Sequence, residues 1–296
     1  MDTPDWTLTR SFLAVAESGS LSAAARRLGL SQPTLGRHIA EMEASLGLSL
    51  FTRQPRGLIL TEAAEALLPH ARAMAESAAR LALTAAGRDA ALTGSVRLTA
   101  SRIVAYHLLP PVLAELRLAE PGIEIDLVAS DETGNLLYRE ADIALRMYRP
   151  TQEGTFARHL ADLPTAFYAA RSFLDRHGRP QMVEALLELD FIGFDRSELI
   201  LRMMAGFGIS RRREDFPLRC DDQIVNWNLV RAGLGIGGMQ CAIGDADPLV
   251  ERVAPFLPLP PLPLWLTAPE ALRQTPRVRR VWDHLASALQ PKHDFG

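Results

Sequence analysis

The chain has 296 residues, of which 48% are hydrophobic and 23% charged, and its formal net charge is −3. This composition is ordinary for a soluble protein of two or three domains, and no charge-free run of about 20 apolar residues predicts a membrane span. The polar first ten residues do not resemble a signal peptide, and two cysteines do not indicate a disulfide framework, so the cytoplasm is the expected compartment.

Positive charge is concentrated near the N-terminus. Residues 20–60 contain five arginines and two glutamates, which gives this segment a local charge of +3 in an acidic chain. A basic segment of this kind favours contact with nucleic acid.

The same segment predicts three short helices. Apolar residues recur at helical spacing up to Gly19, Ser20 fits the N-cap of a second helix that ends at Gly29, and Ser31 fits the N-cap of a third. The third helix places Leu35, Ile39, Met42 and Leu46 on one face and polar residues on the others. This order predicts a helix-turn-helix whose last helix presents its N-terminus and polar side chains to DNA.

A β-hairpin and a long helix are predicted next. Leu50 and Phe51 begin a strand, Leu58 and Leu60 form its return, and the tip TRQPRG carries two arginines suited to the DNA backbone or minor groove. Thr61 fits the cap of the long helix, whose apolar positions step by three and four residues and predict a seam for a partner helix. The predicted seam consists of Ala64, Leu67, Ala71, Met74, Ala78, Leu81 and Ala85.

From Ser95 onward, short apolar strands alternate with helical patterns. Strands are predicted at 96–101, 123–128 and 142–147, with helices at 107–119 and around 135–139, and this order predicts a parallel sheet covered by helices. Further strands are predicted at 165–169, 191–194, 236–239, 249–253 and 262–267, with helices at 226–232 and 278–289. The return of the chain near Leu264 predicts two subdomains joined by two crossover strands, as in periplasmic binding proteins.

The glycine run at 233–238 follows a helix and precedes a strand, which is the reverse of a dinucleotide-binding fingerprint.

The N-terminal module resembles that of the LysR-type transcriptional regulators, in the segments AESGSLSAAARRLGLSQPTLGRHIAEMEASLGLSLF and RGLILTEAAEALL. READIALR and LVRAGLGIGGM are similar to segments of that family's regulatory domain. The resemblance implies that the following residues face DNA: Ser22, Ser31, Gln32, Pro33, Thr34, Arg37, His38, Arg53 and Arg56. Gly36 departs from the family, which usually has serine there; the change removes a hydroxyl that could bind phosphate and weakens the helix by about 1 kcal/mol.

The resemblance also implies a small-molecule effector bound between the subdomains. The matching positions are Ser101, Ser130, Thr133, Arg146, Gly193, Phe194, Asp195, Gln223 and Met239. Hydroxyls at helix N-termini and Arg146 would suit a carboxylate, whereas Asp195 would oppose an anion, so the sequence leaves the effector open. Whether Cys220 and Cys241 have a redox role also stays open.

The expected fold class is therefore α+β overall. It comprises a winged helix-turn-helix domain (1–61), a dimerising linker helix (62–87), a hinge (88–94) and an α/β effector domain (95–296). Subdomain I of the effector domain spans about 95–164 and 266–296, and subdomain II about 165–265. The expected partners are double-stranded DNA, an effector and further copies of the chain as a homodimer or homotetramer, with RNA polymerase as a further candidate.

Two alternatives remain beside an effector-controlled regulator. One is an enzyme or solute-binding domain fused to a DNA-binding module, and the other is an architectural DNA-binding dimer that senses nothing. The sequence contains no metal-spaced His/Cys cluster, no G-x-S-x-G elbow and no Walker loop, so no catalytic site, metal or cofactor is expected.

Overall fold

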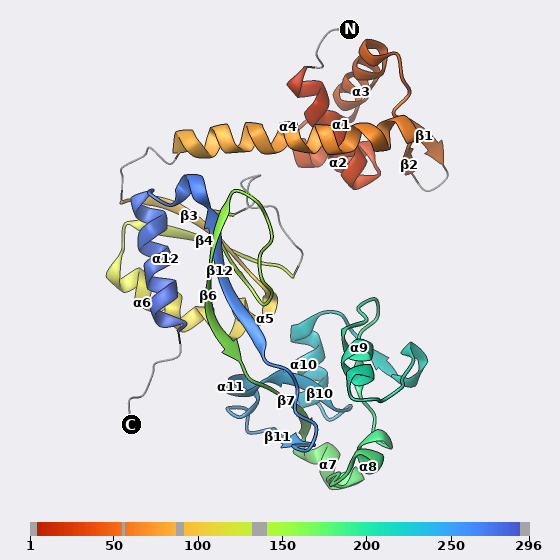
Figure 1. Ribbon diagram of the computed structural model, residues 1–296, viewed down its shortest axis with the longest axis vertical. Helices are drawn as coiled ribbons and strands as arrows, with labels where there is room; N and C mark the ends of the chain where they lie inside the picture. The colour runs from red at the N-terminus through yellow and green to blue at the C-terminus, as the bar shows by residue number, and fades with distance from the viewer. Residues whose placement is uncertain (1–4, 55–56, 87–91, 132–140, 291–296) are drawn as a thin grey trace. The chain divides into compact units, whose positions relative to one another are not determined.

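The computed structural model describes residues 5–54, 57–86, 92–131 and 141–290. They fall into two compact units that divide between Ala85 and Ala86. The first unit contains helices α1 (Trp6–Ser18), α2 (Leu21–Leu28) and α3 (Gln32–Leu46), strands β1 (Phe51–Gln54) and β2 (Gly57–Leu60), and the long helix α4 (Glu62–Ala86). This is the predicted order of parts (Figure 1).

Local signals set the helix boundaries of the first unit. The side chains of Asp5, Ser20 and Ser31 accept hydrogen bonds from backbone N–H groups in the first turns of α1, α2 and α3. Each of these helices ends at a glycine in the left-handed conformation. The hairpin is fixed to the helices, because the Leu58 N–H donates to the Gly19 carbonyl over 3.0 Å.

A single apolar core holds the first unit together. Phe12 of α1 and Leu35 of α3 are fully buried in it, as are Leu50 and Ala64. Leu35, Ile39 and Met42 are all buried, so the predicted inner face of α3 is confirmed. The opposite face of α3 is thereby left free for another molecule.

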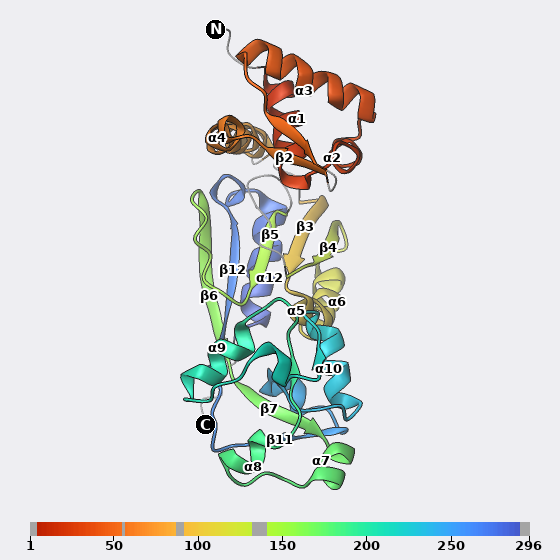
Figure 2. The ribbon, with the colours of Figure 1, turned by 90° about the vertical axis from the view of Figure 1, so that its right-hand side faces the viewer.

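The second unit contains a five-stranded sheet in the order β4-β3-β5-β12-β6, which Figure 2 shows face on. Its elements are β3 (Gly94–Ala100), α5 (Arg102–His107), α6 (Leu109–Ala119), β4 (Ile123–Ala129), β5 (Ile143–Arg146), β6 (Thr155–Leu163), β12 (Leu262–Pro269), the 3-10 turn η3 (Glu270–Leu272) and α12 (Pro276–Ala288). Phe156 of β6 packs on Trp282 of α12, which covers one face of the sheet.

The expectation of a parallel sheet is only half right. β3 pairs in parallel with β4 and β5, but β12 is antiparallel to both β5 and β6. The reason is the crossover itself: the chain leaves this sheet along β6 and must return along β12 in the opposite direction.

A smaller sheet, ordered β10-β7-β11 and antiparallel throughout, forms the core of the rest of the unit. The elements here are β7 (Thr165–Ala170), α7 (Arg171–His177), α8 (Val183–Leu187), β8 (Ile192–Gly193), α9 (Leu199–Gly206), the 3-10 turn η2 (Arg213–Asp215), β9 (Leu218–Arg219), α10 (Gln223–Arg231), β10 (Gly237–Gln240), α11 (Cys241–Gly244) and β11 (Val250–Val253). The paired strands β6 and β12 lead from the larger sheet to this one (Figure 1).

Several predicted elements need correction. The helix expected over 107–119 is α6, which begins at Leu109 and holds Pro110 and Pro111 in its first turn, where a missing N–H costs nothing. The helix expected around 135–139 lies outside the described residues. Helix α5, strand β6 and helices α7 to α9 were not predicted. Among the described residues, no helix is both long and apolar enough to cross a membrane.

Candidate nucleic-acid interface and effector site

The start of α3 presents an exposed polar surface. Gln32, Pro33 and Arg37 are exposed, and Ser22 of α2 donates from its hydroxyl to Gln32 Oε1 over 3.1 Å. This bond holds the Gln32 amide beside the turn. Ser31 and Thr34 form the cap, with their hydroxyl oxygens 2.8 Å apart and the Thr34 N–H donating to Ser31 Oγ. At this helix start Pro33 has no N–H and the Thr34 and Leu35 N–H groups both donate to Ser31, so the Gln32 N–H is the donor left to meet an anion. One turn further on, the exposed Arg37 side chain lies 3.7 Å from the Glu41 carboxylate.

His38 does not belong to this exposed set. Its Nδ1 lies 2.9 Å from the hydroxyl oxygen of Ser11, which is 1% exposed in α1. The ring therefore ties α3 to α1, because a buried hydroxyl requires a hydrogen-bond partner. Sequence spacing does not indicate this role, because Ser11 and His38 are 27 positions apart.

The hairpin carries Arg53, which is exposed on β1 opposite Leu58. Arg56 lies outside the described residues. The +3 charge of this segment and the open Arg53 side chain suit the phosphate backbone.

The long helix contradicts part of the predicted seam. Ala64 is fully buried and Ala71 is 4% exposed, and both belong to the core of their own chain, where Leu67 packs on them. A partner helix therefore cannot contact Ala64 or Ala71. Leu81 is 76% exposed and Met74 is 37% exposed, so only the later part of the seam presents large apolar side chains. The side chain of Ala85 lies outside the described residues.

Two predicted effector residues meet at the ends of β3 and β5. Ser101 and Arg146 are each 5% exposed. The Ser101 N–H donates to the carbonyl of Leu145, while Arg146 Nη2 donates to Thr99 Oγ1 over 3.0 Å. Ser130 is half-buried at the end of β4, where its N–H donates to the Ala100 carbonyl. Thr133 lies outside the described residues.

The effector residues predicted on the other subdomain differ from one another in burial and in their contacts. Gly193 is buried, with its carbonyl accepting from the Cys220 N–H and from Asn226 Nδ2. Phe194 packs against the core of its own subdomain, and the Asp195 carboxylate pairs with Arg213. Phe194 is only partly buried and the Asp195 side chain is half exposed, so contact of either with an effector stays a prediction. Gln223 begins α10 and Met239 is buried on β10.

Charged contacts join the two subdomains through α5 and α10. Arg102 Nη1 lies 2.6 Å from Asp222 Oδ2, and Asp222 caps α10 by accepting from the N–H groups of Ile224 and Val225. At the other end of α5, His107 faces Arg231 and Asp247, which pair at 2.6 Å. Burial and the charge of Arg231 lower the pKa of His107, although Asp247 opposes them. The sequence did not predict these contacts.

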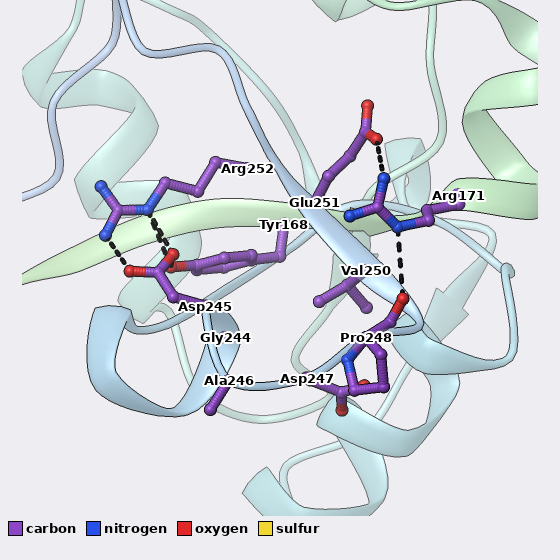
Figure 3. A pocket seen from close by; sticks show the side chains of 10 residues that line it. All are labelled: Tyr168, Arg171, Gly244, Asp245, Ala246, Asp247, Pro248, Val250, Glu251 and Arg252. Atoms are coloured by element: carbon purple, nitrogen blue, oxygen red, sulfur yellow. Dashed lines mark hydrogen bonds and ion pairs between the residues drawn. The ribbon is translucent and has the colours of Figure 1, made fainter.

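A separate hollow of about 370 Å³ lies beside β7 and β11 (Figure 3). Its charged side chains already pair with one another. Tyr168 Oη donates to Asp245 over 2.8 Å, Arg252 binds the same carboxylate, and Arg171 pairs with Glu251 at 2.9 Å. Burial, followed by the bond to Asp245, raises the pKa of Tyr168. Because these side chains bind one another, we interpret the group as one that stabilises the fold and not as a binding site.

Comparisons with known proteins match both units. A family described as "Bacterial regulatory helix-turn-helix protein, lysR family" matches residues 6–65, and "LysR substrate binding domain" matches residues 89–290. The HTH-type transcriptional regulator CrgA of Neisseria meningitidis serogroup C is 32% identical over 183 residues, which are 62% of this chain and 61% of CrgA. The alignment thus spans about three-fifths of that relative.

Solved structures match over a greater length. The structure of CrgA, a LysR-type transcriptional regulator from Neisseria meningitidis, covers 98% of this chain and 100% of its own, with a TM-score of 0.61 and 25% identity. Full-length CbnR complexed with its target DNA covers 97% and 100%, with a TM-score of 0.52 and 22% identity, which is a likeness of fold alone. With a substrate-binding domain matched over 89–290 and the lysR helix-turn-helix over 6–65, this chain belongs to the LysR family of bacterial regulators.

Proposed function

We propose that this protein is a cytoplasmic, sequence-specific DNA-binding regulator of transcription whose second unit binds a small-molecule effector. The observation that carries the DNA-binding part is the start of α3, where the amide of Gln32 is held by Ser22 at the helix N-terminus and the exposed Arg37, paired with the exposed Glu41, follows one turn further on. A glutamine amide can bond an adenine edge in the major groove, while a nearby guanidinium can bond guanine or phosphate.

The proposal includes the division of the chain into residues 1–61, 62–87, 88–94 and 95–296. It also includes assembly into a homodimer or homotetramer through the later part of α4. Two exposed apolar side chains, Met74 and Leu81, support such a contact. RNA polymerase is a further proposed partner.

The effector is proposed to bind between the subdomains of the second unit. Ser101 and Arg146 are buried at strand ends of the larger sheet, while Gln223 and Met239 come from the smaller subdomain. The ion pair between Arg102 and Asp222, the chain neighbours of Ser101 and Gln223, supports this proposal. Ligands of α/β sheets bind at such strand ends.

Binding selection from random duplexes tests the DNA-reading role. The Gln32→Ala protein should select a different base at one position in each half-site, with a cost of about 1–3 kcal/mol for the original base. Gln181→Ala removes an equally exposed glutamine of the second unit and should select the original sequence. Identical selection by the wild-type and Gln32→Ala proteins would refute direct reading by Gln32.

A further inference from the structure

Ser11 carries a buried hydroxyl that bonds outside its own helix. Thr9 and Ser18 of α1 donate from their hydroxyls to the backbone carbonyl four residues earlier, as helical serines and threonines commonly do. Among the described residues, the Ser11 Oγ bonds only Nδ1 of His38, at 2.9 Å. Because a buried hydroxyl proton is costly to leave without an acceptor, Ser11 must donate its proton to Nδ1.

This bond determines where the imidazole ring carries its own proton. A neutral imidazole has one N–H, so a ring that accepts at Nδ1 holds its proton on Nε2. In the described part of the chain, Nε2 of His38 has no hydrogen-bond partner, and it is not among the buried side-chain atoms that lack one. His38 is half-buried, so Nε2 reaches the surface and offers a hydrogen-bond donor there.

The charges around the ring do not hold it as an imidazolium. No carboxylate of the described residues lies at ion-pair distance from His38. The Asp5 carboxylate accepts from the Thr7 N–H, and this bond lowers the pKa of Asp5 most, whereas His38 has the smallest effect on it. Glu41 lies 3.7 Å from Arg37. The ring therefore has no fixed counter-charge, and the neutral form that accepts from Ser11 is favoured.

His38 lies on the flank of α3. The next residue, Ile39, is buried against the core, whereas the preceding residue, Arg37, is exposed. Successive residues of a helix are about 100° apart, so His38 lies between the inner face and the outer ridge. When a helix lies in a DNA groove, its outer ridge faces the bases and its flanks face the strands that line the groove. The Nε2 donor is therefore placed for the DNA backbone.

We propose that Ser11 is a positioning residue for DNA binding, whose hydroxyl holds the His38 ring neutral and directs its Nε2–H at a phosphate oxygen. This contact is a neutral hydrogen bond. Unlike an arginine, it neutralises no phosphate and releases no counterion from the DNA. The inference rests on the proposed function, because it concerns how the proposed DNA-binding helix meets its ligand.

Solid-state ¹⁵N NMR of the full chain, labelled at its seven histidines, tests the protonation in the absence of DNA. At about pH 8, where histidine is generally neutral, His38 should carry a proton on Nε2 and none on Nδ1. Its signals are assigned by their loss in His38→Ala. Ser11→Ala should allow both tautomers, and Ser11→Thr, which keeps the hydroxyl, should restore the single one. A wild-type ring with its proton on Nδ1, or on both nitrogens, overturns the proposal.

DNA affinity measured over a range of salt concentrations tests the contact itself. Ser11→Ala should weaken binding to selected and random duplexes alike by about 2- to 10-fold, because one neutral hydrogen bond is lost. The slope of log affinity against log salt should stay as in wild type, whereas the loss of an imidazolium contact would lower it by about one unit. In a His38→Ala protein, Ser11→Ala should have no further effect, because the serine acts through the ring.

Thr9→Val is the matched control, because Thr9 is 2% exposed on the same helix and its hydroxyl donates to the Asp5 carbonyl. It should keep both the tautomer and the DNA affinity. The proposal is overturned if Ser11→Ala binds DNA as wild type does, lowers the salt slope, changes the selected sequence, or has the same effect with and without His38→Ala. A wild-type protein that prefers no duplex refutes the proposed function as well, whereas one that selects a duplex and gives any of these results refutes only the role of Ser11.

Discussion

Replacing Gly36 with alanine tests how much an interior glycine lowers the stability of α3. It lies inside the helix with an ordinary negative φ, and a Cβ added there would meet nothing within 4 Å. Gly36→Ala should therefore remove the backbone entropy cost of an interior glycine without a clash and stabilise the first unit by about 0.5–1 kcal/mol. For a domain of this size, that corresponds to a rise of about 2–8 °C in its unfolding midpoint.

Gly47 is the matched control. It also has nothing within 4 Å of an added Cβ, but its φ is +66°. The same substitution there should destabilise by about 1–2 kcal/mol, because an L-residue is strained in the left-handed region. Calorimetry of the full chain measures the change in unfolding midpoint for both variants. Equal signs for Gly36→Ala and Gly47→Ala would refute the argument that backbone conformation, and not space, sets the effect.

Three further predictions concern DNA contact, assembly and pH. Arg53→Ala should weaken binding to all duplexes alike and reduce the slope of log affinity against log salt by about one unit. Leu81→Glu should leave the chain folded but shift light-scattering mass towards the monomer, since this side chain is 76% exposed in the single chain. For His107, the lowered pKa means that the unfolded chain takes up its proton first, so the stability contribution of the neutral ring is present above about pH 6.5 and is lost as pH falls. His107→Gln should therefore reduce the fall in unfolding midpoint between about pH 7.5 and 5.5.

Each of these three variants has a matched control, in which a residue of the same type is replaced elsewhere in the chain. Arg196→Ala should keep the salt slope, Leu118→Glu on α6 should keep the oligomeric mass, and His177→Gln should keep the pH profile, because all three side chains are exposed in the second unit. An unchanged oligomer in Leu81→Glu would remove α4 from the interface, and an unchanged pH profile in His107→Gln would show that other groups set it.

Local signals made the first unit predictable. A cap such as Ser31 and a left-handed glycine such as Gly47 act within one turn of the chain, so sequence spacing is sufficient to place α3. Strand β6 lacks such signals: it is an edge strand on which Arg158 and His159 are not sorted into a clean alternation. Its place is fixed only by pairing with β12, about a hundred residues later.

The second unit shows where spacing is insufficient for a site. Arg146 could be selected as the end of an apolar strand, but its burial depends on Thr99 and its isolation on the absence of an acid among its described neighbours. The buried, unpartnered Nε1 of Trp265 and Oε1 of Gln240 could not be predicted, because an unmet hydrogen-bonding atom is visible only once the surrounding chain is placed. The prediction that Ala64 contacts a partner helix was wrong for a related reason. An apolar stripe on a helix does not indicate whether its own chain or a partner chain will cover it.

The pairing of β6 with β12 has a mechanical consequence. Because β6 and β12 are hydrogen-bonded to each other from Thr155 to Leu163, neither strand can slip without the other, and this paired segment can move only as a two-stranded ribbon. The register of that ribbon shifts between Leu264 and Trp265. A bulge of this kind interrupts the ladder, bends the strand and increases its local twist. A contact made at Trp265 would thus act where the pairing of the ribbon is interrupted.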